Sequence, residues 1–370
     1  MQVWNRGDIN AASRRAIEDM DLAQNYPKEV ETKNDGVAHL MYAIPGIFKV
    51  TSENADMPPL VITGGMHGDE KAGIVILDRL IQAIIDGTLP VKRSLLLMYG
   101  NLQAMKANNF SGVRCTEPEA GVTSNLNRCF GRGKFDTPRC YAEKRANEMT
   151  TAIERFVEAH GRPEVLDVHQ SFSVPTLRDV RGGVADRSEY TYAMLYPVNG
   201  DLETTLRWIH AGFSDIVAGA VVNDMSLSHH TFAGYMAAAF GAQAVTLEQG
   251  TIGFVDHTTF TPQLQENLAR KIAGEEKLTN PEGFDVWRYL RGITKKSKNF
   301  RFVDDDGVVM GNRAPIDFLP RPAGIFARDG YDSYELATGE RPLFAKADVP
   351  IGDRAAAVIE RLETGLVPAP

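Results

Sequence analysis

The segment best suited to chemistry is Leu60–Glu70, which reads LVITGGMHGDE. An apolar run that predicts a buried strand ends there in two glycines, and His67 and Glu70 follow, three positions apart. In a tight loop or one helical turn, this spacing lets both side chains reach a common point. Imidazole nitrogen and carboxylate oxygen together suit zinc, and a catalytic zinc typically takes three protein ligands and keeps one position for water. The segment therefore predicts two of the three ligands of a catalytic zinc site.

The third ligand is expected from the end of another strand. His169, in VLDVHQS, closes a second apolar run, and neighbouring strands of one sheet would bring it beside His67 and Glu70. The ordinary alternative for His169 is a hydrogen-bonded core histidine. His257, in a polar loop, is a weaker alternative ligand. We predict one Zn²⁺ per chain, held by His67, Glu70 and His169.

A hydrolytic metal site also needs a proton acceptor. One carboxylate beside the open metal position can take a proton from water and return it to the leaving group. Glu248, in AVTLEQG, stands at the end of a further apolar run and is the candidate for this role. An ordinary strand-end carboxylate is the alternative interpretation.

Asn127 and Arg128, in SNLNRCFGRG, are candidates for binding a substrate carboxylate. A planar guanidinium binds a carboxylate through two parallel hydrogen bonds, and an adjacent asparagine adds a donor and an acceptor. An Asn-Arg pair taken alone is equally consistent with a surface arginine. The sequence offers further cationic candidates that it does not rank: Arg114, Arg132, Lys106 and Arg178.

The elements that must position these residues alternate between strands and helices from about residue 58. Apolar runs predict strands over 58–65, 94–101, 164–171, 191–197 and 242–250, and helical spacing predicts helices over 71–87, 140–161, 201–219 and 262–274. Such alternation implies an α/β fold with a largely parallel sheet and helices on both of its faces. In such sheets, ligand sites gather outside the carboxyl ends of the strands, where the candidate residues stand.

The two ends of the chain differ from this pattern. A helix is expected over 11–22, and short strands around a Pro-Gly turn over 36–50. Near residue 280 the sequence changes to short β-like pieces broken by Gly, Pro and Asp. We predict a catalytic domain over residues 1–280 and a small β-rich domain over 285–370.

Composition excludes several classes of protein. The 370 residues contain three cysteines and no C-x-x-C pair, which argues against a disulfide framework and a thiolate zinc site and favours a reducing cytoplasm. The formal net charge is −8, with no block of basic residues, so no nucleic-acid partner is expected. No stretch approaches the roughly 20 apolar residues of a membrane span. An anionic substrate would need local arginines to attract it against this net charge.

Five segments, in order, resemble motifs of the succinylglutamate desuccinylase/aspartoacylase family, which shares its fold with zinc carboxypeptidases. They lie over about residues 58–260 and read GGMHGDE, YGNLQAMKAN, SNLNRCFGR, LDVHQSF and TFAGYMAAAFGAQAVTLEQG. The Phe-Gly-Ala before the last strand and the length of the C-terminal part make the resemblance closer to the succinylglutamate desuccinylase branch. Ordered motifs of this number are far more specific than any one of them.

The resemblance implies functional residues at the positions already singled out. These are zinc ligands at His67, Glu70 and His169, a general base at Glu248, and a substrate-carboxylate pair at Asn127 and Arg128. Among the arginines, we choose Arg114 to stabilise the oxyanion. The chain departs from the family at Asn125, where an aspartate is usual, at Leu102, where a proline is usual, and at Gln103, where aspartoacylases carry an arginine.

The expected activity is zinc-dependent hydrolysis of the amide bond in a small anionic N-acyl amino acid. N-succinyl-glutamate, cleaved to succinate and glutamate in arginine catabolism, is the first choice. The alternatives are another N-acyl amino acid such as N-acetyl-aspartate, a carboxypeptidase-like peptidase or amidase, and a zinc-binding scaffold without turnover. A metal-independent α/β hydrolase is disfavoured because no G-x-S-x-G motif occurs. The sequence also allows a homo-oligomer.

Overall fold

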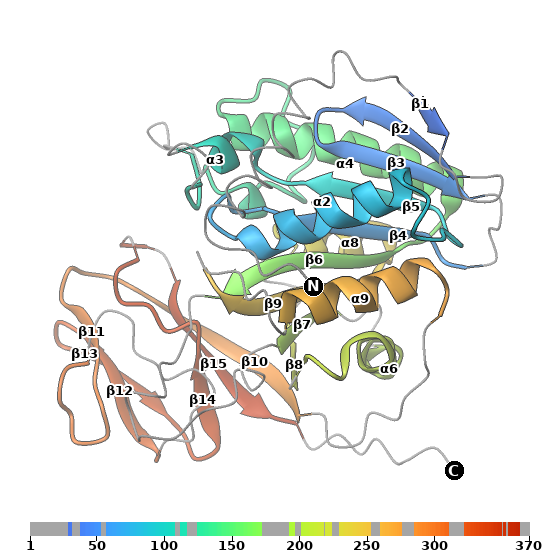
Figure 1. The fold of residues 1–370 in the computed structure, drawn as a ribbon. Coiled ribbons are helices and arrows are strands. Elements are labelled where there is room, and N and C mark those ends of the chain that lie inside the picture. Colours follow the sequence, from blue (N-terminus) through green and yellow to red (C-terminus); the bar gives the residue numbers. More distant parts are fainter. Residues whose placement is uncertain are drawn as a thin grey trace, which may run out of the picture.

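One mixed sheet of 12 strands organises the chain, in the order β1-β2-β3-β5-β4-β6-β9-β7-β8-β10-β15-β14 (Figure 1). The computed structural model describes residues 29–31, 38–52, 57–107, 112–116, 124–171, 192–196, 201–217, 219–223, 229–252, 260–275, 285–310, 322–349, 351–352 and 354–362. The strands of this sheet are β1 (Glu29–Glu31), β2 (Ala38–Ile44), β3 (Ile47–Ser52), β4 (Leu60–Gly64), β5 (Leu95–Tyr99), β6 (Glu164–Ser171), β7 (Tyr192–Tyr196), β8 (Gly219–Val222), β9 (Gln243–Thr251), β10 (Asp285–Thr294), β14 (Glu340–Leu343) and β15 (Arg354–Arg361).

The centre of the sheet consists of two groups of parallel strands. Strands β5, β4, β6 and β9 run in one direction, and β7, β8 and β10 run parallel to one another but antiparallel to β9. Antiparallel pairs flank this centre at both edges. The predicted mostly parallel sheet is thus confirmed for the strands that carry the candidate residues.

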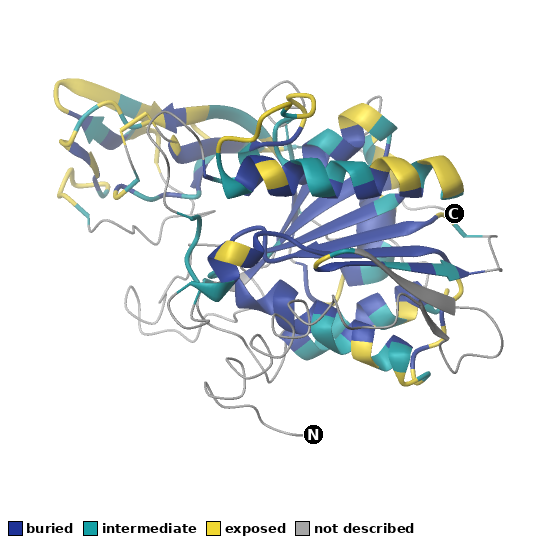
Figure 2. Cartoon of the chain, turned by 90° about the horizontal axis from the view of Figure 1, so that it is seen from above, coloured by how far each residue is buried: buried dark blue, intermediate teal, exposed yellow. Residues whose placement is uncertain are grey.

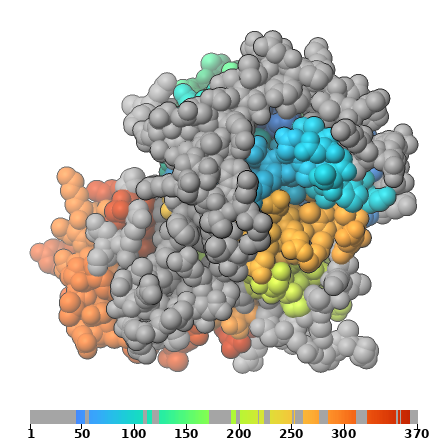
Figure 3. All heavy atoms as spheres, viewed as in Figure 1, coloured from blue at the N-terminus to red at the C-terminus, as the bar shows by residue number. Residues whose placement is uncertain are grey.

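Helices cover both faces of the sheet, as the sequence predicted (Figure 2). They are α2 (Lys71–Ile85), α3 (Leu102–Lys106), the 3₁₀ turn η2 (Leu126–Arg128), α4 (Tyr141–His160), α6 (Leu202–Phe213), α8 (Phe232–Phe240) and α9 (Phe260–Ile272). Because successive strand residues point to opposite faces, Ile62 belongs to the apolar cluster that includes residues of α2, α6 and α9, whereas Val61 belongs to the cluster that includes residues of α4 and α8. Figure 3 shows α2 in cyan, α9 in yellow-orange and α6 in yellow-green as neighbours on the first of these faces.

The C-terminal strands continue the main sheet. Strand β10 pairs in parallel with β8 and antiparallel with β15, so β10, β15 and β14 extend the same hydrogen-bonded sheet. The strands β11 (Phe300–Phe302), β12 (Gly324–Asp329) and β13 (Asp332–Leu336) form a separate antiparallel sheet. The predicted β-rich character after residue 285 is confirmed, while the division into two domains stays a prediction.

The short strand β8 was not predicted. The expected helix over 201–219 begins at the cap Asp201, whose carboxylate accepts a hydrogen bond from the Thr204 N–H (3.0 Å), but it ends at Phe213. Strand β8 then follows, and its four residues are too few to show a periodic pattern. The expected helix over 11–22 lies outside the described residues. Among the helices that the structure describes, none is long and apolar enough to cross a bilayer.

Two glycines bring α2 directly against β4. A Cβ atom on Gly64 would lie 2.6 Å from the carbonyl carbon of Gly73, so only glycine permits this approach. Strand β4 and helix α2 flank the loop that carries His67 and Glu70. The glycine contact therefore fixes the position of that loop.

We expect Gly64→Ala to lower the free energy of unfolding by about 1–3 kcal/mol, because the new methyl group must displace the backbone of α2. Urea denaturation measures the change. The matched control is Gly212→Ala in α6, where a Cβ would meet only the Lys271 side chain at 3.8 Å. The free energy of unfolding of that variant should rise by roughly 0.5–1 kcal/mol, since alanine favours the helix more than glycine does. Equal effects of the two substitutions would contradict the close packing of α2 on β4.

Candidate metal centre

The carboxyl ends of three parallel strands bring the candidate residues to one edge of the sheet. His67 and Glu70 follow β4, His169 lies near the end of β6, and Glu248 lies in β9. In the β6–β9 pairing, His169 stands opposite Glu248. The structure therefore gathers residues that are separated by as many as 181 positions, from His67 to Glu248, as expected for a parallel sheet.

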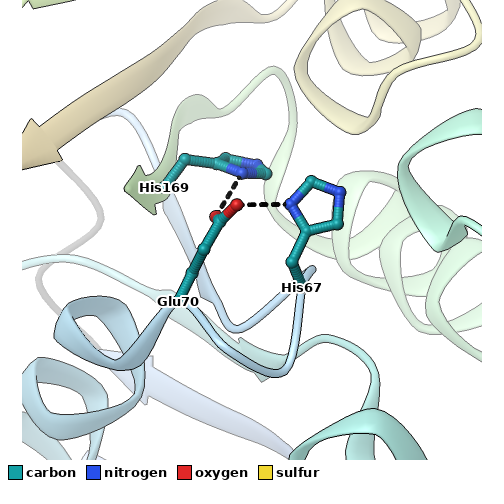
Figure 4. Close-up of side chains that lie close together, drawn as sticks. All are labelled: His67, Glu70 and His169. Carbon is teal, nitrogen blue, oxygen red and sulfur yellow. Dashed lines mark hydrogen bonds and ion pairs between the residues drawn. The ribbon is translucent and has the colours of Figure 1, made fainter. Parts of the chain in front are cut away.

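The carboxylate of Glu70 lies between the two histidines (Figure 4). Its Oε1 is 2.6 Å from Nδ1 of His67, and its Oε2 is 2.8 Å from Nδ1 of His169. One ligand atom from each of the three residues lies within 4.8 Å of the others, and all three residues are buried. Two imidazole nitrogens and a carboxylate are a ligand set that suits zinc.

Each imidazole has a polar partner on its outer nitrogen. Nε2 of His169 lies 2.8 Å from Oδ2 of Asp167, whose Oδ1 accepts a hydrogen bond from the Thr63 hydroxyl (2.5 Å). Nε2 of His67 lies 3.2 Å from Oδ1 of Asn125. In a metal-bound form, Nε2–H of each ring would donate to its outer partner, and Nδ1 would face the metal ion. Outer partners of this kind orient metal ligands and set their tautomers, so the arrangement fits a bound metal ion.

The charges of the three residues also fit a cation. Burial, together with the positive charge of Arg114, lowers the pKa of His67 to about 4, so this ring is neutral near neutral pH. Burial opposes ionisation of Glu70, but its interactions with the two histidines outweigh burial and lower its pKa well below the usual value. Burial also disfavours charge on His169, yet Asp167 and Glu70 outweigh it and raise the pKa of His169 well above the usual value. A cation at Nδ1 of His169 would therefore replace a proton.

Gln170 ties α2 to this centre. Its backbone N–H donates to Oε2 of Glu70 (3.2 Å), and its side-chain oxygen accepts from the Ala72 N–H (3.2 Å) in the first turn of α2. Glu70 is the N-cap residue of α2, but its side chain makes no capping hydrogen bond. The carboxylate is thus turned toward the histidines, and Gln170 satisfies the helix end instead.

Glu248 lies beside the three candidate ligands. Its side chain is half-buried. Burial and the charge of Glu70 raise the pKa of Glu248 to about 7, although His169 and Arg114 act in the opposite direction. A carboxyl group that titrates near the working pH can both accept and donate a proton.

Asn127 and Arg128 lie in η2, next to the histidines. Oδ1 of Asn127 accepts from the Phe232 N–H (2.7 Å), and Nδ2 of Asn127 lies 3.4 Å from Nε2 of His169. Nη1 of Arg128 donates to the Asn127 carbonyl (2.7 Å). The structure therefore uses Asn127 to join η2 to α8 beside the metal centre, while the guanidinium of Arg128 keeps further donors for a ligand.

Arg114 also reaches the centre. Its Nη1 lies 3.0 Å from Oε1 of Glu70, and its side chain is 33% exposed. Of the other cationic candidates, Arg132 is exposed and Lys106 is half-buried. Arg178 and the alternative ligand His257 lie outside the described residues.

Comparison with known proteins defines the family. A profile described as the succinylglutamate desuccinylase/aspartoacylase catalytic domain matches residues 56–272, more than half of the chain. The chain belongs to this family. Its members are deacylating hydrolases, and the resemblance inferred from the five motifs is confirmed.

Individual relatives agree with this assignment. The succinylglutamate desuccinylase of Erwinia tasmaniensis is 26% identical over 344 residues, covering 91% of this chain and 94% of its own. Solved structures of succinylglutamate desuccinylases share the fold. The enzyme from Vibrio parahaemolyticus has a TM-score of 0.69 at 21% identity and covers 94% of this chain and 95% of its own. The enzyme from Chromobacterium violaceum has a TM-score of 0.69 at 20% identity, with coverages of 96% and 98%.

Two polar residues of this family member were given no role by sequence reasoning. The spacing of Asp167 is enough to predict that it lies beside His169, because it precedes His169 by two positions and residues two apart in a strand share a face. Asn125 differs from the aspartate that is usual in the family, and this difference alone predicts no contact with a metal ligand. No local pattern shows that its amide oxygen reaches His67, 58 positions earlier.

We expect His169→Ala to weaken zinc binding by more than about 100-fold, because one of three ligands is lost and even outer partners contribute 10–100-fold. Competition with a chromophoric chelator measures the affinity. His160→Ala is the control, since His160 packs against Phe156 at the end of α4. It should keep the affinity of the unaltered protein. One tightly bound zinc in the His169→Ala protein would exclude His169 as a ligand.

Proposed function

We propose that this chain is a zinc-dependent amidohydrolase that removes the acyl group from an N-acyl amino acid. The proposed substrate is N-succinyl-glutamate, which is cleaved to succinate and glutamate in arginine catabolism. The observation that carries the proposal is the convergence of His67, Glu70 and His169 beside Glu248, whose pKa of about 7 suits proton transfer. Relatives named succinylglutamate desuccinylase support the choice of substrate.

In this proposal, the two histidines and Glu70 would hold a zinc ion, which would supply Lewis-acid chemistry to the water and the scissile carbonyl. Glu248 accepts the proton of the attacking water as the new C–O bond forms. It then donates that proton to the nitrogen of the departing amine as the C–N bond breaks. One carboxyl group can serve in both directions because its pKa lies near neutrality.

Arginines are proposed to bind and polarise the substrate. Arg128 pairs with no carboxylate among the described residues, so its guanidinium is available to bind a carboxylate of the substrate through two hydrogen bonds. Asn127 holds η2 and therefore Arg128 in place. Arg114 stabilises the developing oxyanion, which requires that it share its contact with Glu70. Fixed geometry of this kind supplies much of the rate in enzymes.

The proposed setting is the cytoplasm. The three cysteines of the chain, Cys115, Cys129 and Cys140, are free thiols, which agrees with a reducing compartment. The proposed partner is a small anionic substrate, and no nucleic acid or membrane is part of the proposal. A homo-oligomer stays a prediction.

The first test is amine release from N-succinyl-glutamate, N-acetyl-aspartate and a short peptide. Each is measured with added zinc and after removal of metal by a chelator. We expect zinc-dependent release from the succinyl compound and little from the others. Release mainly from N-acetyl-aspartate or the peptide would support zinc-dependent amide hydrolysis but exclude N-succinyl-glutamate as the main substrate. No turnover of any of the three, with zinc bound tightly, would favour the scaffold alternative.

We expect Glu248→Gln to lower kcat by about 10²–10⁴-fold, because the amide cannot accept the proton of water. Zinc content, measured by atomic absorption, should stay at the level of the unaltered protein. Glu203→Gln, which changes an exposed carboxylate on α6, is the control and should keep full activity. Full activity of Glu248→Gln would remove this residue from the mechanism.

A further inference from the structure

A third arginine lies near Arg114 and Arg128. It is Arg354, the first residue of β15, and it is exposed. Burial, and then the positive charges of Arg354 and Arg114, lower the pKa of Arg128 to about 10. Arg354 and Arg114 therefore both lie close enough to Arg128 to disfavour its charged form, in a protein whose net charge is −8.

A row of ring contacts connects Arg354 to the reaction centre. Its guanidinium carbon lies 5.0 Å from the centroid of the Phe344 ring. The Phe344 ring in turn lies 5.9 Å from the Tyr192 ring. Tyr192 stands opposite Glu248 in the pairing of β7 with β9. The C-terminal strands thus bring Arg354 toward the strand that carries the proposed base.

The backbone around Arg354 is unusual in two places. Phe344 has a φ of 57°, and among the described residues it is the only one other than glycine with a positive φ. Strain of this kind is concentrated at ligand sites, because the surrounding structure must enforce it. A Cβ on Gly292 would lie 2.8 Å from the Tyr289 hydroxyl and 3.5 Å from Cδ of Arg354, so the glycine leaves room for these side chains.

Arg354 differs from its neighbours in lacking a carboxylate partner. Three other arginines of β10 and β15 form ion pairs: Arg288 with Glu360, Arg291 with Glu340, and Arg361 with Asp285. In the part of the chain that the structure describes, no carboxylate pairs with Arg354 or with Arg128. Like charges held together without counter-charges are costly, and a bound anion removes that cost.

We propose that Arg354 is a specificity-determining residue that binds a second carboxylate of the substrate, apart from the one bound by Arg128. This carboxylate belongs either to the acyl group or to the side chain of the amino acid. The inference rests on the proposed function. It makes the site selective for N-acyl amino acids that carry an additional negative charge.

The test compares three substrates with the zinc-loaded full chain. N-succinyl-glutamate carries both additional carboxylates, N-acetyl-glutamate lacks the one in the acyl group, and N-succinyl-norvaline lacks the one in the side chain. Arg354→Gln should lower kcat/KM for N-succinyl-glutamate by about 10–100-fold, mainly through KM, because a hydrogen-bonded charge pair is lost. The substrate that lacks the carboxylate bound by Arg354 should keep its kcat/KM in this variant. That substrate therefore identifies which carboxylate Arg354 binds.

Two further variants separate binding from structure. Arg354→Lys keeps the positive charge but loses the planar guanidinium with its two parallel donors. Its kcat/KM for N-succinyl-glutamate should therefore fall less than that of Arg354→Gln. Arg361→Gln makes the same change at the other end of β15, where Arg361 pairs with Asp285, and should leave all three substrates unaffected. An equal fall in kcat/KM for all three substrates in Arg354→Gln, or no fall for any of them, would overturn the proposal.

A binding measurement distinguishes failure of this inference from failure of the proposed function. If the unaltered protein hydrolyses none of the three compounds, the proposed function fails. Calorimetric titration then compares glutarate with butyrate on the zinc-loaded protein. Weaker glutarate binding in Arg354→Gln, with unchanged butyrate binding, would support a carboxylate site at Arg354. Unchanged glutarate binding would overturn it.

Discussion

The carboxylate of Glu70, shared between two buried imidazoles, is the interaction on which the rest of the site depends. A buried carboxylate loses its hydration, and only nearby positive charge and hydrogen bonds can offset that loss. Nδ1 atoms at 2.6 Å and 2.8 Å and the guanidinium of Arg114 at 3.0 Å provide them. The neighbouring structure also accommodates the position of this carboxylate. Helix α2 gives up its own side-chain cap, Gln170 from β6 replaces it, and Gly64 and Gly73 allow the close packing that places the loop.

The outer partners of the two histidines differ in charge. His169 is paired with the carboxylate of Asp167, while His67 is paired with the neutral amide oxygen of Asn125. A carboxylate partner raises the basicity of an imidazole ligand more than an amide does. The opposite pKa shifts of the two rings have this origin in part, since Asp167 favours the charged form of His169 and Arg114 disfavours that of His67. The proposed ligand set therefore combines a more basic and a less basic histidine.

Positive charge is concentrated locally in an acidic protein. The chain carries 40 basic and 48 acidic residues. Several ion pairs between described residues lie on the surface, where each contributes little stability. Arginines from three segments come together around Arg128, and no carboxylate among the described residues pairs with Arg128 or Arg354. The continuous sheet contributes to this, because β10, β15 and β14 extend it from β8. Phe344, which follows β14, contacts Tyr192, and Tyr192 stands opposite Glu248. Such a local excess of charge attracts anions despite the net charge of the molecule.

Residue type and periodicity were sufficient to predict the α/β architecture and to select His67, Glu70, His169 and Glu248. Each of these residues stands at the end of an apolar run, and the ends of parallel strands must meet. Only the tertiary structure decided how their neighbours act. Asn127 is held by the backbone of Phe232, Asn125 reaches His67, and the four-residue β8 joins the C-terminal strands to the main sheet. These contacts join positions far apart in the chain, and no local propensity encodes the register that brings them together. The left-handed conformation of Phe344 likewise has no signal in its own residue type, because the surrounding packing imposes it.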